Sequence, residues 1–176
     1  TLQNINHVVF DDILIYDTEI TTGSDSINLV GVFIHYITNV KKVTFSNIGI
    51  RNTVLTRTTG TAVSDVSAVT FAAAASNTGD NSADSVFSVS NLFVQDFRYA
   101  HQKQVRVYVF NTLARFSDFD SMIFDGISMV NCNIGDTTTG SSEAHAGLLH
   151  FSHWVDGRDS LVFDGPDHGL FHVTNF

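Results

Sequence analysis

Apolar and polar residues alternate along most of this chain, in short runs that a two-residue break interrupts. The unit is apolar-x-apolar, two break residues, then apolar-x-apolar. It recurs as VVFDDILI at 8–15, VTFSNIGI at 43–50, FSVSNLFV at 87–94 and IFDGISM at 123–129, and a partial copy, LVFDG, occupies 161–165. Alternation with a period of two predicts β-strands. We therefore predict a strand, a tight corner and a second strand in every copy.

The second residue of each break is of a type that turns the backbone sharply. These residues are Asp12, Asn47, Asn91, Gly126 and Gly165. Asp, Asn and Gly enter the left-handed region of backbone conformation at a lower cost than other residues. We predict that all five form structural corners at equivalent places in the repeat.

A third apolar run lies between consecutive copies. It reads VGVFIHYI at 30–37, AVTFAAA at 68–74, VYVFNTL at 107–113 and LLHFSHWV at 148–155. Because stacked repeats place like residues over like, we predict a core ladder in each type of strand. The ladder members are Phe10, Phe45, Val89, Phe124 and Phe163 in the first strand, and Phe33, Phe71, Phe110 and Phe151 in the third.

Three short strands in each repeat, with no helical pattern between them, predict one turn of a parallel β-helix. We expect a single all-β domain over 1–176, with about four coils of three strands each. A β-propeller is the main alternative, because a blade of about 40–45 residues has a similar period. A β-sandwich is disfavoured, since signals for hairpin turns are few.

The segments VTFSNIGIRN and VFSVSNLFV resemble the pectin-lyase-like right-handed parallel β-helix superfamily, with Asn47 and Asn91 as candidates for its corner asparagine ladder. The resemblance covers nearly the whole chain and implies a right-handed coil. This fold is shared by polysaccharide lyases, glycosidases, phage tailspikes, adhesins and autotransporter passengers. The resemblance therefore implies an architecture and does not select a function.

Long polar segments follow the second strand of each repeat, at 16–26, 51–65, 95–104 and 131–145. We interpret them as loops that leave the same corner and form a fringe along one side. Insertions on one face of a repeat protein often mark its binding face, so this fringe is a candidate surface for a glycan.

Neither end of the sequence contains an amphipathic helix or a polar cap. A bare solenoid end exposes core side chains and unpaired strand edges, which proteins normally cover. We therefore expect uncapped ends, and a chain that is a segment of a longer β-helix or a subunit that stacks on itself or on other modules.

Charge and composition narrow the classes of partner. The net charge is −9, which disfavours binding to nucleic acid. The sequence contains no apolar run of about 18 residues, so no membrane span is expected. The single cysteine, Cys132, cannot form an internal disulfide, and we interpret it as apolar filler.

Candidate catalytic groups are weak. Asp156 and Asp159, with Arg158 between them, could act in acid–base chemistry or in a calcium-dependent lyase site. Polygalacturonase-like enzymes carry an Asp-Asp pair and a Gly-His-Gly, which Asp11-Asp12 and Asp167-His168-Gly169 resemble. The repeat places these two motifs at opposite ends of the stack, so the similarity does not form a site.

Histidines are frequent toward the C-terminal end, where His150 and a neighbour could form a surface cluster. His35 and His153 occupy equivalent positions three coils apart, too far to share a ligand. We predict no metal site and no cofactor. The favoured function is a non-enzymatic structural or adhesive β-solenoid of an extracellular filament, spike or appendage on a cell or virion surface. The alternative is a polysaccharide lyase, a glycosidase or a glycan-binding β-helix.

Overall fold

The computed structural model describes residues 2–23, 26–35, 37–59, 63–71, 85–100, 105–116, 119, 121–134, 144–154, 160–163 and 171–174. These residues form strands, turns and bends, and they contain no helix. The strands are β1 (Leu2–Thr22), β2 (Asn28–Ile34), β3 (Ile37–Arg57), β4 (Ser64–Phe71), β5 (Val86–Ala100), β6 (Val105–Phe116), β7 (Ser121–Val130), β8 (Asn133–Ile134), β9 (Ala144–Trp154), β10 (Ser160–Phe163) and β11 (Phe171–Thr174).

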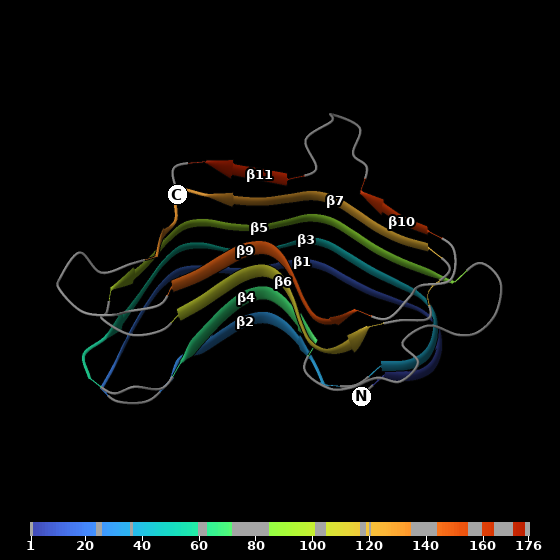
Figure 1. Cartoon of the computed structure of the whole chain (residues 1–176), viewed down its shortest axis with the longest axis horizontal. Helices are drawn as coiled ribbons and strands as arrows, with labels where there is room; N and C mark the ends of the chain where they lie inside the picture. Colours follow the sequence, from blue (N-terminus) through green and yellow to red (C-terminus); the bar gives the residue numbers. More distant parts are fainter. Residues whose placement is uncertain are drawn as a thin grey trace.

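The strands form two parallel sheets that the chain visits in turn (Figure 1). The first sheet has the order β1-β3-β5-β7-β10, with β11 paired to β7 and β8 paired to β5. The second has the order β2-β4-β6-β9. Every pairing between the described strands is parallel. The expected all-β class is confirmed, and the arrangement is consistent with a parallel β-solenoid.

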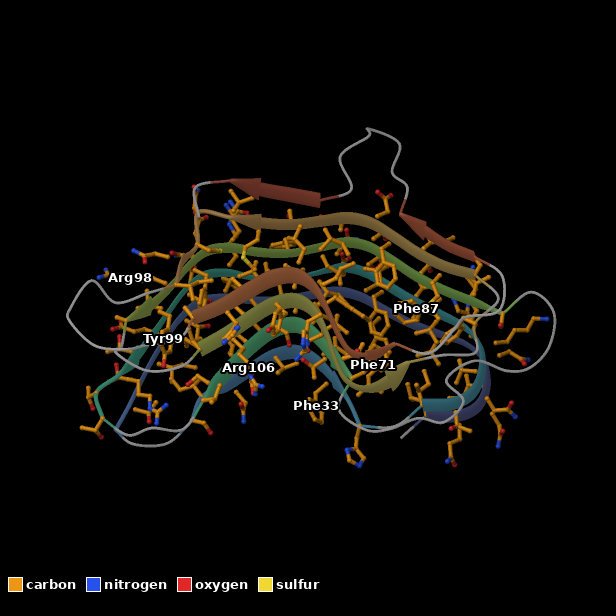
Figure 2. The ribbon with its side chains drawn as sticks, in the orientation of Figure 1. Phe33, Phe71, Phe87, Arg98, Tyr99 and Arg106 are labelled. Carbon is orange, nitrogen blue, oxygen red and sulfur yellow. The ribbon has the colours of Figure 1, made fainter. Side chains whose placement is uncertain are left out.

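The core lies between the two sheets, where aromatic side chains contact one another across the layers (Figure 2). The first-strand anchors occupy one register column of the first sheet: Phe10, Phe45, Val89, Phe124 and Phe163. Phe87 occupies the space beside the smaller Val89, with its ring centroid 5.6 Å from that of Phe45 and 5.7 Å from that of Phe124. Phe71 contacts Phe45 from the second sheet, with the two ring centroids 5.7 Å apart.

The predicted third-strand ladder is wrong in its register. Phe33 pairs with Thr70, not with Phe71, and its side chain is 57% exposed. One observed column contains Ile34, Phe71, Thr112 and Phe151. A second column contains Val32, Val69, Phe110 and Leu149. Phe33 precedes the inward-facing Ile34 by one residue, and a shift of one residue moves a side chain to the other face of a sheet.

The expected loop fringe is also corrected. The segments that begin at 16, 51 and 95 continue as strand to Thr22, Arg57 and Ala100. Each contains a further corner, after which alternate side chains turn inward; these are buried in β3 and partly buried in β1. The sequence signal was weak because two of the inward side chains, Thr53 and Arg57, are polar.

Left-handed corners occur in three register columns, of which the sequence predicted one. Positive φ values are found at Asn4 and Asn39, at Asp12, Asn47, Asn91 and Gly126, and at Asp17, Asn52, Asp96 and Asn131. Gly165, the fifth predicted corner, lies outside the described residues. All the non-glycine members are Asn or Asp, the types that accept this conformation most readily.

Side-chain amides link the corners of neighbouring strands. Asn91 Nδ2 donates to Asn47 Oδ1 at 2.9 Å, and Asn47 Nδ2 donates to Asp11 Oδ1 at 3.1 Å. In the other two columns Asn39 donates to Asn4, Asn52 to Asp17 and Asn131 to Asp96. Each amide donates toward the strand that comes earlier in the sequence, so the corners fix both the turn and the register.

We predict that substitutions of Asn47 separate these two roles. Asn47→Gly keeps the positive φ and loses the amide contacts, so it should lower the free energy of unfolding by about 1 kcal/mol. Asn47→Ala loses the same contacts and, unlike glycine, keeps a Cβ in the left-handed region without the polar group by which asparagine tolerates it, which should cost about 1–2 kcal/mol more than the glycine variant. Urea unfolding of both variants measures the two free energies of unfolding. Equal losses would argue against backbone strain at this position in the alanine variant.

A second prediction compares two phenylalanines that the sequence alone placed in the core. Phe45→Ala should lower the free energy of unfolding by about 3–5 kcal/mol, because its buried ring contacts both neighbouring strands and the opposite sheet. Phe33→Ala, at an exposed position, should change it by less than about 0.5 kcal/mol. Denaturant unfolding of both variants tests the register, and a comparable loss at Phe33 would refute it.

Candidate functional site

A pocket of about 320 Å³ opens on the outer face of the second sheet, over β6 and β9. Its lining residues are Val63, Arg106, Tyr108, His145 and His150. Arg106 and Tyr108 reach this face because β6 alternates, with Val105, Val107 and Val109 buried on the core side. The pocket therefore uses the solvent side of a sheet whose other side packs in the core.

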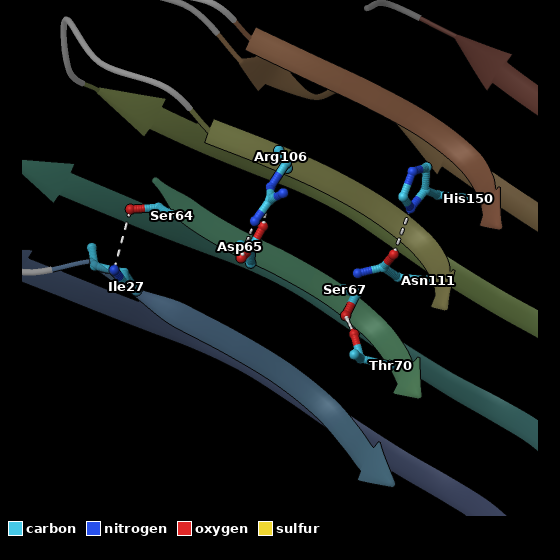
Figure 3. Close-up of polar contacts among 8 residues, drawn as sticks. All are labelled: Ile27, Ser64, Asp65, Ser67, Thr70, Arg106, Asn111 and His150. Atoms are coloured by element: carbon cyan, nitrogen blue, oxygen red, sulfur yellow. Dashed lines mark hydrogen bonds and ion pairs between the residues drawn. The ribbon is translucent and has the colours of Figure 1, made fainter. Parts of the chain in front are cut away.

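Parallel register gathers its side chains into columns. One column contains Asp65, Arg106 and His145, a second contains Ser67, Tyr108 and Gly147, and a third contains Thr70, Asn111 and His150. Figure 3 shows polar contacts between the second and third strands of this sheet and between the third and fourth. The site is thus assembled from strands far apart in sequence.

Arg106 is held by a two-point ion pair with Asp65. Its Nε lies 2.6 Å from Oδ1 and its Nη2 lies 2.7 Å from Oδ2 (Figure 3). The hydrogen bonds to Asp65 raise the pKa of Arg106 above its usual value. A guanidinium has five N–H groups, so both on Nη1 and one on Nη2 are not used by Asp65. The carboxylate orients the guanidinium without occupying all of it.

His150 is fixed by a hydrogen bond and by ring stacking. Its Nδ1 lies 2.8 Å from Oδ1 of Asn111, a residue that is 2% exposed (Figure 3). The imidazole also stacks on Tyr108, with ring centroids 4.5 Å apart and an interplanar angle of 12°. Gly147 pairs with Tyr108, and a Cβ there would lie 3.4 Å from the Tyr108 ring.

The protonation of His150 follows from these neighbours. A carbonyl oxygen only accepts hydrogen bonds, so the tautomer that bonds to Asn111 Oδ1 is the one with its proton on Nδ1, and in that tautomer Nε2 holds a lone pair. Burial lowers the pKa of His150 from 6.5, Arg106 lowers it further, and Asp65 opposes both. The ring is therefore neutral at neutral pH, with Nε2 as a hydrogen-bond acceptor.

The arrangement is suited to binding rather than to acid–base chemistry. Arg106 offers charged donors, His150 offers an acceptor, and Tyr108 offers an aromatic surface. Hydrolysis of a glycosidic bond ordinarily requires two carboxyl groups about 5–10 Å apart. Asp65 is the one carboxylate that the structure shows in contact with these described residues, and it is paired with Arg106.

The predicted catalytic candidates Asp156, Arg158 and Asp159 lie outside the described residues. Asp11, of the Asp11-Asp12 pair, accepts hydrogen bonds from Ser46 and Asn47 and so has a structural role at the corner.

The two equivalent histidines are separated in the structure. His35 is exposed just after β2, whereas His153 lies in β9 and pairs with Arg115. β2 and β9 are the two edge strands of the second sheet, with β4 and β6 between them. The structure therefore does not bring these histidines together.

Asp65, Arg106 and Tyr108 were not among the residues predicted from the sequence. Their signal is a column of polar residues at the outward positions of the third strand, spaced by 41 residues from Asp65 to Arg106 and by 39 from Arg106 to His145. Alignment of these strands on their phenylalanines shifted the register and hid the column. The structure places His150 in this pocket, stacked on Tyr108.

Other candidate chemistry is limited in the described part of the chain. No group of three or more His, Cys, Asp or Glu side chains there could hold a metal ion. Cys132 is buried, its Sγ contacts the carbonyl oxygens of Val94 and Val130 at 3.5 Å, and burial raises the pKa of its thiol. Among the described residues, no helix has the length and apolar character required to cross a membrane.

Comparisons with protein-family models, with curated proteins and with solved structures found no match to this chain. The resemblance to pectin-lyase-like proteins therefore rests on the repeat and its corners. The observed class is an all-β protein built from parallel sheets.

We predict a specific pH dependence of stability from His150. Its folded pKa lies below its unfolded value of 6.5, so the unfolded state binds the proton first as pH falls. Stability is retained above pH 6.5 and falls as pH drops from there toward the folded pKa. Urea unfolding at about pH 7.5 and about pH 5.5 measures this difference.

The comparison variant is His150→Phe, which keeps a ring over Tyr108 and removes the titration. Its loss of stability between the two pH values should be smaller than that of the wild type. Identical losses would show that His150 does not contribute. Replacing Arg106 with Gln should raise the pKa of His150, which the Hε1 resonance reports by NMR.

Proposed function

We propose that this chain is a structural module of a larger assembly, in which further β-strands stack on β1. In this proposal the fold is a single-stranded right-handed parallel β-helix of about four coils. The assembly is an extracellular filament, spike or surface appendage, and the module is non-enzymatic.

The observation that carries the proposal is the incomplete burial of the apolar face of β1. Seven apolar side chains of β1 are only partly buried against the core: Leu2, Ile5, Val8, Phe10, Ile13, Ile15 and Ile20. Their register partners in β3 are at most 1% exposed: Ile37, Val40, Val43, Phe45, Ile48, Ile50 and Leu55. One more layer would give β1 the burial that β3 already has, and each side chain would gain part of the about 1.5–3 kcal/mol that complete burial of an exposed apolar side chain contributes.

The backbone of β1 supports the same interpretation. β1 has 21 residues and stands at the edge of the first sheet, where among the described strands it pairs only with β3. A long unpaired edge beside apolar side chains is a template for another strand. Natural proteins usually protect such an edge by covering it.

The corner residues indicate what the covering strand must supply. Asp11 and Asp17 accept hydrogen bonds from Asn47 and Asn52 of β3. Ionised carboxylates cannot donate, so these two positions cannot pass a hydrogen bond on to an added strand, just as Asp96 in β5 accepts from Asn131 and has no proton to donate. An added strand that carries donor side chains at these positions would hydrogen-bond to the two carboxylates.

A pair of lysine substitutions on β1 tests the proposal. Ile13→Lys places a charge on the partly buried apolar face of β1 that an added layer would cover, and Leu14→Lys places one at an exposed position on the outer face. Sedimentation velocity and electron cryo-imaging of the purified protein should show elongated or polymeric particles. Ile13→Lys should convert these into monomers, while Leu14→Lys should leave them intact.

Two results would contradict the proposal. One is a compact, stable monomer of the unmodified chain at all concentrations. The other is release of reducing or unsaturated sugar ends from a panel of acidic glycans, which would favour the alternative, a lyase or a glycosidase.

A further inference from the structure

We infer that the pocket on the second sheet binds a small hydroxylated carboxylic acid, with Arg106 taking the carboxylate and His150 taking a hydroxyl group. This inference is independent of stacking on β1, because the pocket lies on the outer face of the other sheet. The ligand class follows from the donors and acceptors that the fold has fixed in place.

The guanidinium selects the carboxylate. Asp65 contacts Nε and Nη2, which leaves the two N–H groups on Nη1 and one on Nη2 for a second partner. Planar guanidinium groups match the two oxygens of a carboxylate. Arg106 is 39% exposed at its side chain, so a ligand can reach it.

The imidazole selects a hydroxyl group. Asn111 holds the proton on Nδ1, so the neutral ring presents Nε2 as an acceptor. A carboxylate cannot donate to this nitrogen, whereas a hydroxyl can. The stack on Tyr108 holds the ring in place before any ligand arrives. Preorganised groups of this kind raise affinity, because less freedom is lost on binding.

The size of the pocket limits the ligand. A volume of about 320 Å³ lies at the lower end of the range for small-molecule sites, about 300–1,000 Å³. A six-carbon hydroxy acid is a reasonable occupant. The same chemistry occurs in a free open-chain acid and in the acidic ring of a glycan, so the experiment includes both.

Isothermal titration calorimetry of the full chain at neutral pH tests the inference with five probes. Gluconate and methyl glucuronoside carry a carboxylate and hydroxyl groups, in open-chain and ring form respectively. Methyl glucoside and sorbitol carry hydroxyl groups alone, and acetate carries a carboxylate alone. We expect saturable binding of gluconate or of the glucuronoside, with at least about tenfold weaker binding of the other three. The tighter of the two acids identifies the source.

Variants assign the roles. Arg106→Gln should weaken binding of the preferred acid at least about tenfold. The double variant Asp65→Asn with Arg106→Gln avoids an unpaired carboxylate and should lose binding equally, which separates ligand binding from folding. Arg98→Gln is the matched control, since Arg98 lies on β5 in the other sheet and is exposed (Figure 2). It should bind as the wild type does.

His150→Phe tests selectivity rather than stability. The variant keeps a ring over Tyr108 and removes Nε2, so the preferred acid should bind no better than acetate. The inference is overturned if neither acid binds saturably, if the hydroxylated compounds without a carboxylate bind equally well, or if His150→Phe retains full preference for the hydroxylated acid.

Discussion

The left-handed corner carrying a side-chain amide is the constraint on which this structure depends. A parallel stack has no hairpin to set its register, and a slip of one residue would turn the apolar face outward. At these corners an Asn, an Asp or Gly126 adopts positive φ, and at several of them an amide of the next repeat donates to the corner side chain, as Asn91 does to Asn47 and Asn52 to Asp17. The turn and the register are thus set by the same side chain. The buried Phe45, stacked on Phe10 with centroids 5.0 Å apart, relies on that alignment.

The sequence predicted the middle corner and the first-strand ladder because two independent signals agree there. Asn47 marks a turn by its chemistry, and the alternation around Phe45 marks a strand. The third strand offered only one signal, a phenylalanine in each repeat. That signal misled the alignment, because Phe33 faces outward whereas Phe71 faces the core. The strand after Asp17 and Asn52 was hidden for a different reason. Its inward positions include Thr53 and Arg57, and Arg57 is buried with its Nε donating to the carbonyl oxygen of Thr59 at 2.9 Å.

The candidate site shows why function was harder to predict than fold. No segment of the sequence contains the site, since Asp65, Arg106 and His150 come from three strands that the repeat brings together. A binding motif read along the chain would not include them. The relevant pattern runs across the repeat, and it becomes visible only when the register is correct to one residue. In this fold the accuracy of the register therefore limits the recognition of sites on the outer face.

The corner residues and the outward-facing residues of the second sheet differ in how much they vary from one strand to the next. Within the stack, amides such as Asn47 can both accept and donate, so one repeat can follow another without change. The carboxylates of Asp11 and Asp17 in β1 and of Asp96 in β5 accept and do not donate, so a run of side-chain hydrogen bonds ends at each of them. On the outer face of the second sheet, by contrast, each column varies from layer to layer, as Asp65, Arg106 and His145 show. The corner residues maintain the fold, so their chemistry must repeat. The outward columns need not repeat, and they can carry side chains that bind a specific ligand.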